Sequence, residues 1–182
     1  MSTIKHQASF EINQPVEELF PLFSAEGEKL WVPGWDYENI MGSTDVHEDY
    51  IFLTSNHHSS DHHGSDHHRA GHHSSANHGA TKMIWLVKRY ESSNYFVQFY
   101  RVEPGDKVGI VTVQCTPISE NLTKVKVAYE YTGLSKKGDD FVAGYTAEAH
   151  EAFISHWPKL LVRYFASKYC VNNFGQTLMN SS

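Results

Sequence analysis

The residues best suited to chemistry gather in one stretch, "NHHSSDHHGSDHHRAGHHSSANHGA", which spans residues 56–80. Nine of its twenty-five residues are histidine, mostly as pairs repeated every five residues. Neutral imidazoles bind zinc, nickel and copper, and Asp61 and Asp66 could add oxygen ligands. The predicted metal ligands are His57, His58, His62, His63, His67, His68, His72, His73 and His78.

The histidine-rich stretch has no regular amphipathic form. A five-residue step rotates by about 140° on a helix and changes face on a strand, so the pairs form no stripe. The composition instead predicts a flexible loop between two strands. Because the repeat is internal and imperfect, a native insertion fits better than a purification tag. The alternatives are a transition-metal site, adventitious metal binding, or a solvated loop that costs little stability.

Acid–base groups are scattered along the rest of the chain. We single out His150 as a candidate proton-transfer group and Arg101 as a candidate ligand anchor. No Ser-His-Asp or Cys-His arrangement and no glycine-rich phosphate loop is visible, so the catalytic residues stay unassigned. The wider set of candidates is His6, Glu11, Arg101, Glu130, Glu148, His150 and His156.

Aromatic side chains are plentiful, at 13% of the chain, and occur in several separate segments. They predict either a cavity lined for an apolar or aromatic ligand, with phenol and indole groups orienting it, or a filled core. The segment "YFVQFYRVE" leaves open whether Phe99 with Arg101 or Gln98 with Tyr100 faces inward. The predicted ligand-binding residues are Trp31, Trp35, Phe52, Trp85, Phe99, Tyr129, Tyr131, Phe153 and Trp157.

The elements that must position these side chains follow from periodicity. "TIKHQASFEIN" alternates as a half-buried strand, and Pro15 and Ser24 suit the starts of two short helices. About six further strands follow, and four of them read as consecutive hairpins. From about Asp140 the apolar spacing predicts one long amphipathic helix, with a break near Pro158. Strands followed by a helix indicate an α+β fold.

The order of elements, with "ASFEINQPVEELFPLFSAEGEKLWVPGW", "YRVEPGD", "VKVAYEYTGLSKKG" and "HWPKLLVRYF" as landmarks, resembles the START/SRPBCC superfamily. The resemblance covers nearly the whole chain except the insertion and the tail, and points to polyketide cyclase/dehydrase-like and lipid-transport-like members. It implies a helix-grip fold, in which a curved antiparallel sheet of about seven strands wraps around a long C-terminal helix. A curved sheet and a straight helix leave a gap for large side chains or a ligand.

Three hypotheses for function follow. The first is binding of a small apolar or aromatic ligand, lipid or polyketide-like, in a cavity between the sheet and the C-terminal helix. The second is a cyclase or dehydratase that uses acid–base groups of that cavity. The third is transition-metal binding or buffering through the histidine-rich insertion, with zinc, nickel or copper. The first two hypotheses require no cofactor.

Composition sets further expectations. The formal net charge of −6 lacks a basic nucleic-acid footprint, and no run is apolar enough to span a membrane. We expect a cytoplasmic protein whose partner is a small hydrophobic molecule, with no nucleic-acid partner and no integral membrane association. The length predicts one helix-grip domain over residues 1–170, with the insertion at 56–80, and a polar tail at 171–182.

Overall fold

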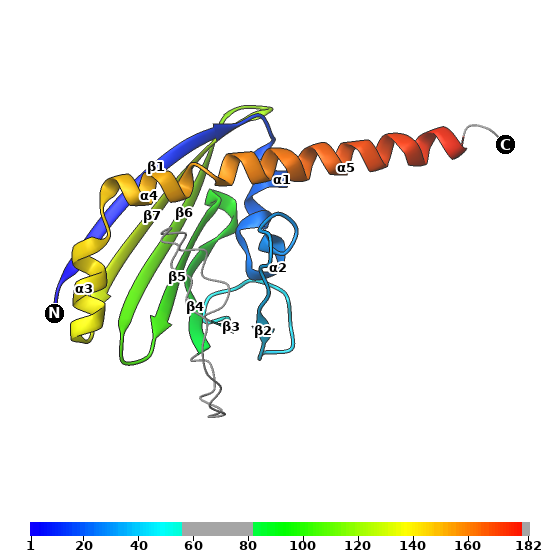
Figure 1. Cartoon of the computed structure of the whole chain (residues 1–182). Coiled ribbons are helices and arrows are strands. Elements are labelled where there is room, and N and C mark those ends of the chain that lie inside the picture. Colours follow the sequence, from blue (N-terminus) through cyan, green and yellow to red (C-terminus); the bar gives the residue numbers. More distant parts are fainter. Residues whose placement is uncertain (56–81, 180–182) are drawn as a thin grey trace, which may run out of the picture.

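The computed structural model describes residues 1–55 and 82–179, with side chains described as far as Cys170. Its described residues form the predicted α+β helix-grip fold, a curved seven-stranded antiparallel sheet with short helices after the first strand and a long C-terminal helix (Figure 1). The strand order is β1-β7-β6-β5-β4-β3-β2. The strands are β1 (Thr3–Ile12), β2 (Glu38–Asn39), β3 (Ile51–Ser55), β4 (Lys82–Glu91), β5 (Phe96–Glu103), β6 (Lys107–Ser119) and β7 (Leu122–Gly133). The helices are α1 (Val16–Leu19), η1 (Phe20–Phe23), α2 (Ala25–Glu28), η3 (Ser92–Asn94), α3 (Lys136–Gly144), α4 (Ala147–Ile154) and α5 (Trp157–Met179).

Alternation along the strands separates the two faces of the sheet. In β5, Val97, Phe99 and Arg101 are buried, while Gln98 bonds Thr112 of β6 on the opposite face. Of the two registers that the sequence left open, the one with Phe99 and Arg101 inward is therefore correct. We call the inward side, over which α4 passes and α5 begins, the concave face.

The predicted single helix from about Asp140 is wrong at its start. The chain forms α3 first, leaves the helical conformation at Tyr145, and begins α4 after Thr146, whose side chain accepts from the Ala149 amide. The apolar spacing continues through this break, so periodicity alone could not reveal it. The break expected near Pro158 is confirmed, because α4 ends at Ile154 and α5 starts at Trp157.

The C-terminal helix covers only part of the sheet. α3 packs on β7 and β1, and α4 and the start of α5 pack on β1. Leu161 and Phe165 of α5 are buried, whereas Val162 is exposed. Figure 1 shows α5 continuing past the end of the sheet and away from the body. It reaches Met179, so helix enters the stretch for which the sequence predicts a polar tail.

The short helices after β1 are held tightly together. The Ser24 hydroxyl accepts from the Gly27 amide at 2.9 Å, which confirms Ser24 as the cap of α2. A Cβ atom at Gly27 would lie 2.2 Å from the carbonyl oxygen of Pro21, so only glycine allows this approach of α2 to η1. The contact fixes the position of Glu28 and of Trp31 one turn later.

Candidate functional site

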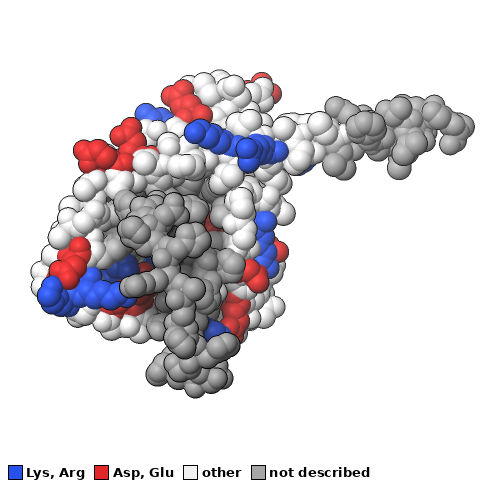
Figure 2. Space-filling model, viewed as in Figure 1, with Lys and Arg blue, Asp and Glu red and all other residues white. Residues whose placement is uncertain are grey.

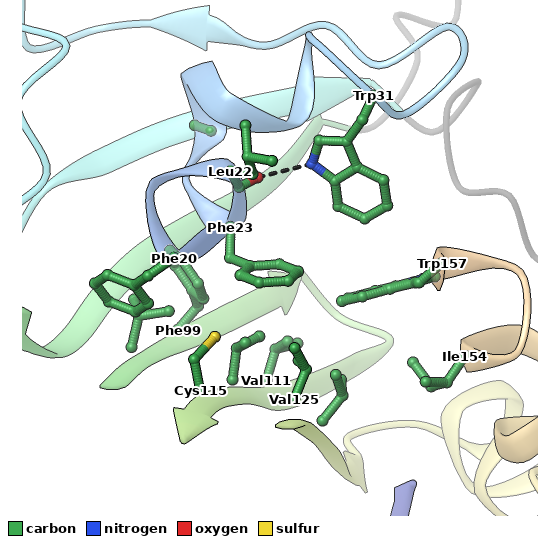
Figure 3. Packing of buried hydrophobic residues seen from close by; sticks show 14 of the residues in the cluster. Phe20, Leu22, Phe23, Trp31, Phe99, Val111, Cys115, Val125, Ile154 and Trp157 are labelled. Atoms are coloured by element: carbon green, nitrogen blue, oxygen red, sulfur yellow. Dashed lines mark hydrogen bonds between the residues drawn. The ribbon is translucent and has the colours of Figure 1, made fainter. Parts of the chain in front are cut away.

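The predicted aromatic residues form two groups of touching rings on the concave side. In the first group, the Trp31 and Trp157 rings lie 5.4 Å apart, and Phe153 links Trp157 to Tyr129 at 5.9 and 6.0 Å. Figure 3 shows Trp31 from the segment after α2 facing Trp157 from α5, with Phe23 beside them. This group joins the segment after α2, the α4–α5 junction and β7.

The second group centres on Trp85. Phe52 stacks on Trp85 with ring centres 5.7 Å apart, and Phe99 and Trp35 each approach it edge-on at 6.1 Å. The Arg101 guanidinium lies 5.6 Å from the Trp85 ring. Tyr131 joins the first group through Tyr129, with ring centres 5.8 Å apart. The structure therefore distributes the nine predicted residues over two packed groups.

The indole N–H groups of three tryptophans are already used by the protein. Trp31 donates to the carbonyl of Leu22 at 2.8 Å, as the dashed line in Figure 3 shows, and Trp35 donates to the carbonyl of Ala25 at 2.9 Å. The third of them, Trp85, donates to the Thr54 hydroxyl at 3.0 Å. These bonds fix the loop after α2 and the β3–β4 pair. Because the indole N–H groups are already bonded, a ligand would contact the rings of these residues.

Arg101 lies in a closed network of charges. It is 7% exposed, donates to the Tyr131 hydroxyl at 2.9 Å, and pairs with Glu103 at 3.2 Å. Lys107, equally buried, binds the other oxygen of Glu103 at 2.7 Å and Asp106 at 3.3 Å. Two buried cations thus face two largely buried carboxylates, which is the arrangement of a structural pair.

His150 forms a hydrogen-bonded pair with Tyr145. Its Nε2 lies 3.4 Å from the Val127 carbonyl and its Nδ1 lies 2.8 Å from the Tyr145 hydroxyl. Because a carbonyl only accepts, we assign the hydrogen to Nε2, and Nδ1 then accepts from the tyrosine. Burial lowers the pKa of His150, the hydrogen bond to the Val127 carbonyl opposes this, and the charge of His6 adds to the lowering. The imidazole is therefore neutral at pH 7 and oriented toward a phenol.

Tyr129 lies where these groups meet. Its ring is 5.6 Å from His150 and 5.8 Å from Tyr131. Burial raises its pKa well above the ordinary value, and charges on Tyr131 and Glu28 raise it further while Arg101 opposes them. Its hydroxyl makes no hydrogen bond to any residue that the structure describes.

Glu28, the last residue of α2, was not among the candidates from the sequence. Its side chain is partly exposed, and its carboxyl group has no hydrogen-bond or ion-pair partner within residues 1–55 and 82–170. Burial raises its pKa to about 8. The available signal was its position three residues before Trp31, since helical spacing places such residues on one face.

Two hollows in the described part of the chain lie away from these aromatics. One, of about 190 Å³, is lined by Tyr37, which precedes β2, and by residues of β2, β3 and β4, including Thr54 and Lys82. The other, of about 250 Å³, lies on the convex face and includes Lys5 and Ala128. Neither is lined by a predicted ligand-binding residue.

The predicted metal ligands, from His57 to His78, lie outside the described residues, and their metal binding stays a prediction. Within residues 1–55 and 82–179, no group of three or more His, Cys, Asp or Glu side chains is placed to hold a metal ion.

Charged side chains of both signs are mixed on the visible surface. Figure 2 shows Lys and Arg next to Asp and Glu in several small groups of the described surface. Among the helices of the described chain, none has both the length and the apolar character needed to cross a bilayer.

Comparisons with known proteins establish the fold. No family model and no curated protein sequence matches the chain. Among solved structures, norcoclaurine synthase from Thalictrum flavum, in complex with dopamine and hydroxybenzaldehyde, has a TM-score of 0.57 and 13% identity over 89% of this chain and 88% of its own. The protein TTHA0849 from Thermus thermophilus has a TM-score of 0.58 and 13% sequence identity, over 90% of this chain and 99% of its own length.

A third similar structure is the di-domain ARO/CYC BexL from the BE-7585A biosynthetic pathway. It has a TM-score of 0.56 and 12% identity, over 91% of this chain and 47% of its own length. The chain thus shares the helix-grip fold of the START/SRPBCC superfamily, as the resemblance in sequence implied. At these identities the likeness establishes the fold alone, and function has to be argued from the site.

Proposed function

We propose that this protein binds a small apolar or aromatic molecule on the concave face, between the sheet and the region where α4 meets α5. The observation that carries the proposal is the group of aromatic rings from separate elements, Trp31, Trp157, Phe153 and Tyr129, which meet on this face. Polar groups withdrawn from water are normally hydrogen-bonded. Tyr129 is 7% exposed and its hydroxyl has no hydrogen-bond partner in the described chain, so we infer that it contacts a ligand.

The aromatic rings support the same proposal. Trp31, Trp157 and Phe153 present large apolar surfaces next to this hydroxyl, and a site of apolar walls with a few polar contacts is typical of small-molecule binding. The proteins of similar fold include one solved with dopamine and hydroxybenzaldehyde and one described as an ARO/CYC.

Acid–base catalysis on the bound molecule is the second candidate. A carboxyl group with a pKa of about 8 can both accept and donate a proton near neutral pH. Tyr145, with His150 as its acceptor at 2.8 Å, is a second proton-handling group close to Tyr129. Proton-handling groups of this kind are what a cyclase or dehydratase would need.

The binding proposal is tested by filling the site. We expect an apolar fluorescent dye to bind the wild-type protein saturably and the Tyr129→Trp variant at least tenfold more weakly, because the larger ring takes up the space beside Phe153. The matched control is Tyr100→Trp, on the convex side of β5, where Lys88 lies 5.0 Å from the Tyr100 ring. Equal dye binding by both variants, each shown folded by circular dichroism, would contradict the proposal.

A further inference from the structure

The break between α3 and α4 is held by two histidines from different elements. His6 of β1 donates from its Nε2 to the Tyr145 carbonyl at 2.9 Å, and the Tyr145 hydroxyl donates to Nδ1 of His150 on α4 at 2.8 Å. The His6 and His150 rings lie 6.4 Å apart. Tyr145, where the chain leaves the helical conformation, is therefore fixed at both its carbonyl and its side chain.

His150 also touches the proposed ligand site. Its ring lies 5.6 Å from that of Tyr129, and the Tyr129 ring lies 6.0 Å from that of Phe153, which is on the same helix as His150. A spacing of three residues places His150 and Phe153 on one side of α4. A change at His150 that displaced α4 would therefore also displace the Phe153 ring from Tyr129 and from Trp157.

The hydrogen bond from Tyr145 to His150 requires the neutral imidazole. His150 is 1% exposed, and its Nε2 hydrogen faces the Val127 carbonyl at 3.4 Å while Nδ1 accepts from Tyr145. A second proton would occupy Nδ1, so the Tyr145 hydroxyl could no longer donate to it. The side chain would also carry a charge withdrawn from water, which is costly without an opposite charge beside it.

The groups that face His150 in the described chain offer no opposite charge. They are His6 of β1, Tyr129 of β7 and Tyr145 before α4, and none of these is negative in acid. The pKa of Glu148, in the first turn of α4, is lowered by hydrogen bonds at the start of that helix, with burial opposing and the charge of His6 adding to the lowering. No carboxylate of the described residues contributes to the pKa of His150.

We propose, on the basis of the ligand site above, that the α3–α4 break is a pH-sensitive switch, in which protonation of His150 ends its hydrogen bond from Tyr145, displaces α4 and weakens ligand binding. Burial lowers the pKa of His150 from its ordinary value of 6.5, the bond to Val127 opposes this, and the charge of His6 adds to the lowering. The switch therefore acts below about pH 6.5. Because the ligand binds the neutral form, affinity falls as pH falls through the pKa of His150.

The test measures binding of Nile red, an apolar dye without a group that titrates in this range, to the whole protein at pH 7.5 and pH 4.5. We expect the wild type to bind the dye about tenfold more weakly at the lower pH. His150→Gln should lose less than about twofold, because glutamine offers one acceptor and one donor but takes up no proton. Each variant is its own reference, since only the ratio of affinities at the two pH values is compared.

His156→Gln is the matched control. His156 follows α4 directly, is exposed, and has its Nδ1 2.8 Å from the Ala152 carbonyl. Its ratio of affinities should equal that of the wild type. Because the chain has 13 histidines, the difference between the two variants assigns the pH dependence to His150.

A second measurement needs no substitution and decides the matter if His150→Gln does not fold. In the free wild-type protein, the NMR signals of the His150 ring should titrate at the pH below which dye affinity begins to fall. An affinity that does not change with pH, an equal change in wild type and His150→Gln, or a His150 ring that titrates elsewhere would overturn this inference and leave the ligand site standing. Failure of the wild type to bind Nile red at pH 7.5 would overturn the proposed function, and this inference with it.

Discussion

Two polar regions of the concave face differ in how their groups are satisfied. Around Arg101, each buried charge has an opposite charge within 3.3 Å, and the Tyr131 hydroxyl accepts a further hydrogen bond from the guanidinium. Around Glu28 and Tyr129, the polar groups have no such partners in the described chain. The first region contributes to holding β5, β6 and α3 together. The second contributes nothing evident to the fold, which is why we assign it to a ligand.

The largest loss of stability should come from removing one charge of the Arg101 ion-pair network. We expect Arg101→Met to lower the free energy of unfolding by about 4 kcal/mol, because it leaves Glu103 buried with one of its two cations missing. Urea denaturation at pH 7 measures the change. The control is Lys136→Met, whose ion pair with Asp140 is exposed and should be worth at most about 0.5 kcal/mol. Equal losses in the two variants would show that the Arg101 network is not structural.

The next largest loss of stability should come from disturbing the packing of α3 against the turn that carries Asp106. A Cβ atom at Gly138 would lie 2.0 Å from the carbonyl oxygen of Asp106, whereas one at Gly144 meets nothing within 4 Å. We expect Gly138→Ala to destabilise the protein by about 3 kcal/mol through overpacking. Gly144→Ala, in the same helix, should leave the melting temperature unchanged or raise it slightly. A harmless Gly138→Ala would mean that α3 can move away from the β5–β6 turn.

Much of the fold could be predicted because burial is periodic along it. Alternation in β5 to β7 and the turn residues between them indicated the hairpins, and Pro158 marked the end of α4. The gap between α3 and α4 could not be predicted from the same signal, because Val142, Tyr145 and Ala149 keep a helical spacing across it. There the capping hydroxyl of Thr146 decides the conformation.

The site was harder to predict from the sequence than the fold. Arg101 and His150 were singled out as ionisable groups in apolar segments, and both are indeed buried, but their partners come from elements far apart in the sequence. Glu28 was missed because "SAEGEKL" reads as an exposed, charged helix. The close approach of α2 to η1 at Gly27, which positions the helix that carries Glu28, is a contact in space that the sequence does not reveal.

The ionisation of Glu28 should make the stability of the protein depend on pH. Because its pKa is raised from 4.5 to about 8 in the folded protein, the native state holds a proton that the unfolded state releases, and stability falls as pH rises through this interval. We expect a loss of about 2 kcal/mol between pH 5 and pH 8, roughly half the full linkage value because solvent still reaches part of the side chain. Glu28→Gln should abolish this loss in denaturation curves measured across the interval. A variant that keeps the wild-type pH dependence would place the titrating group elsewhere.

The smallest effect compares two tyrosines of one strand. Tyr131 and Tyr129 both point to the concave face of β7 and their rings lie 5.8 Å apart, but only the Tyr131 hydroxyl is bonded to a buried cation of the described chain, at 2.9 Å from Arg101. We expect Tyr131→Phe to cost about 1.5 kcal/mol, the value of a hydrogen bond to a charged group, and Tyr129→Phe to cost less than about 0.5 kcal/mol. Ligand affinity should respond in the opposite order, because the hydroxyl that does least for stability is the one left for the ligand. Equal stability losses from the two substitutions would show that Tyr129 has a structural partner, and would remove the contrast on which the ligand site is based.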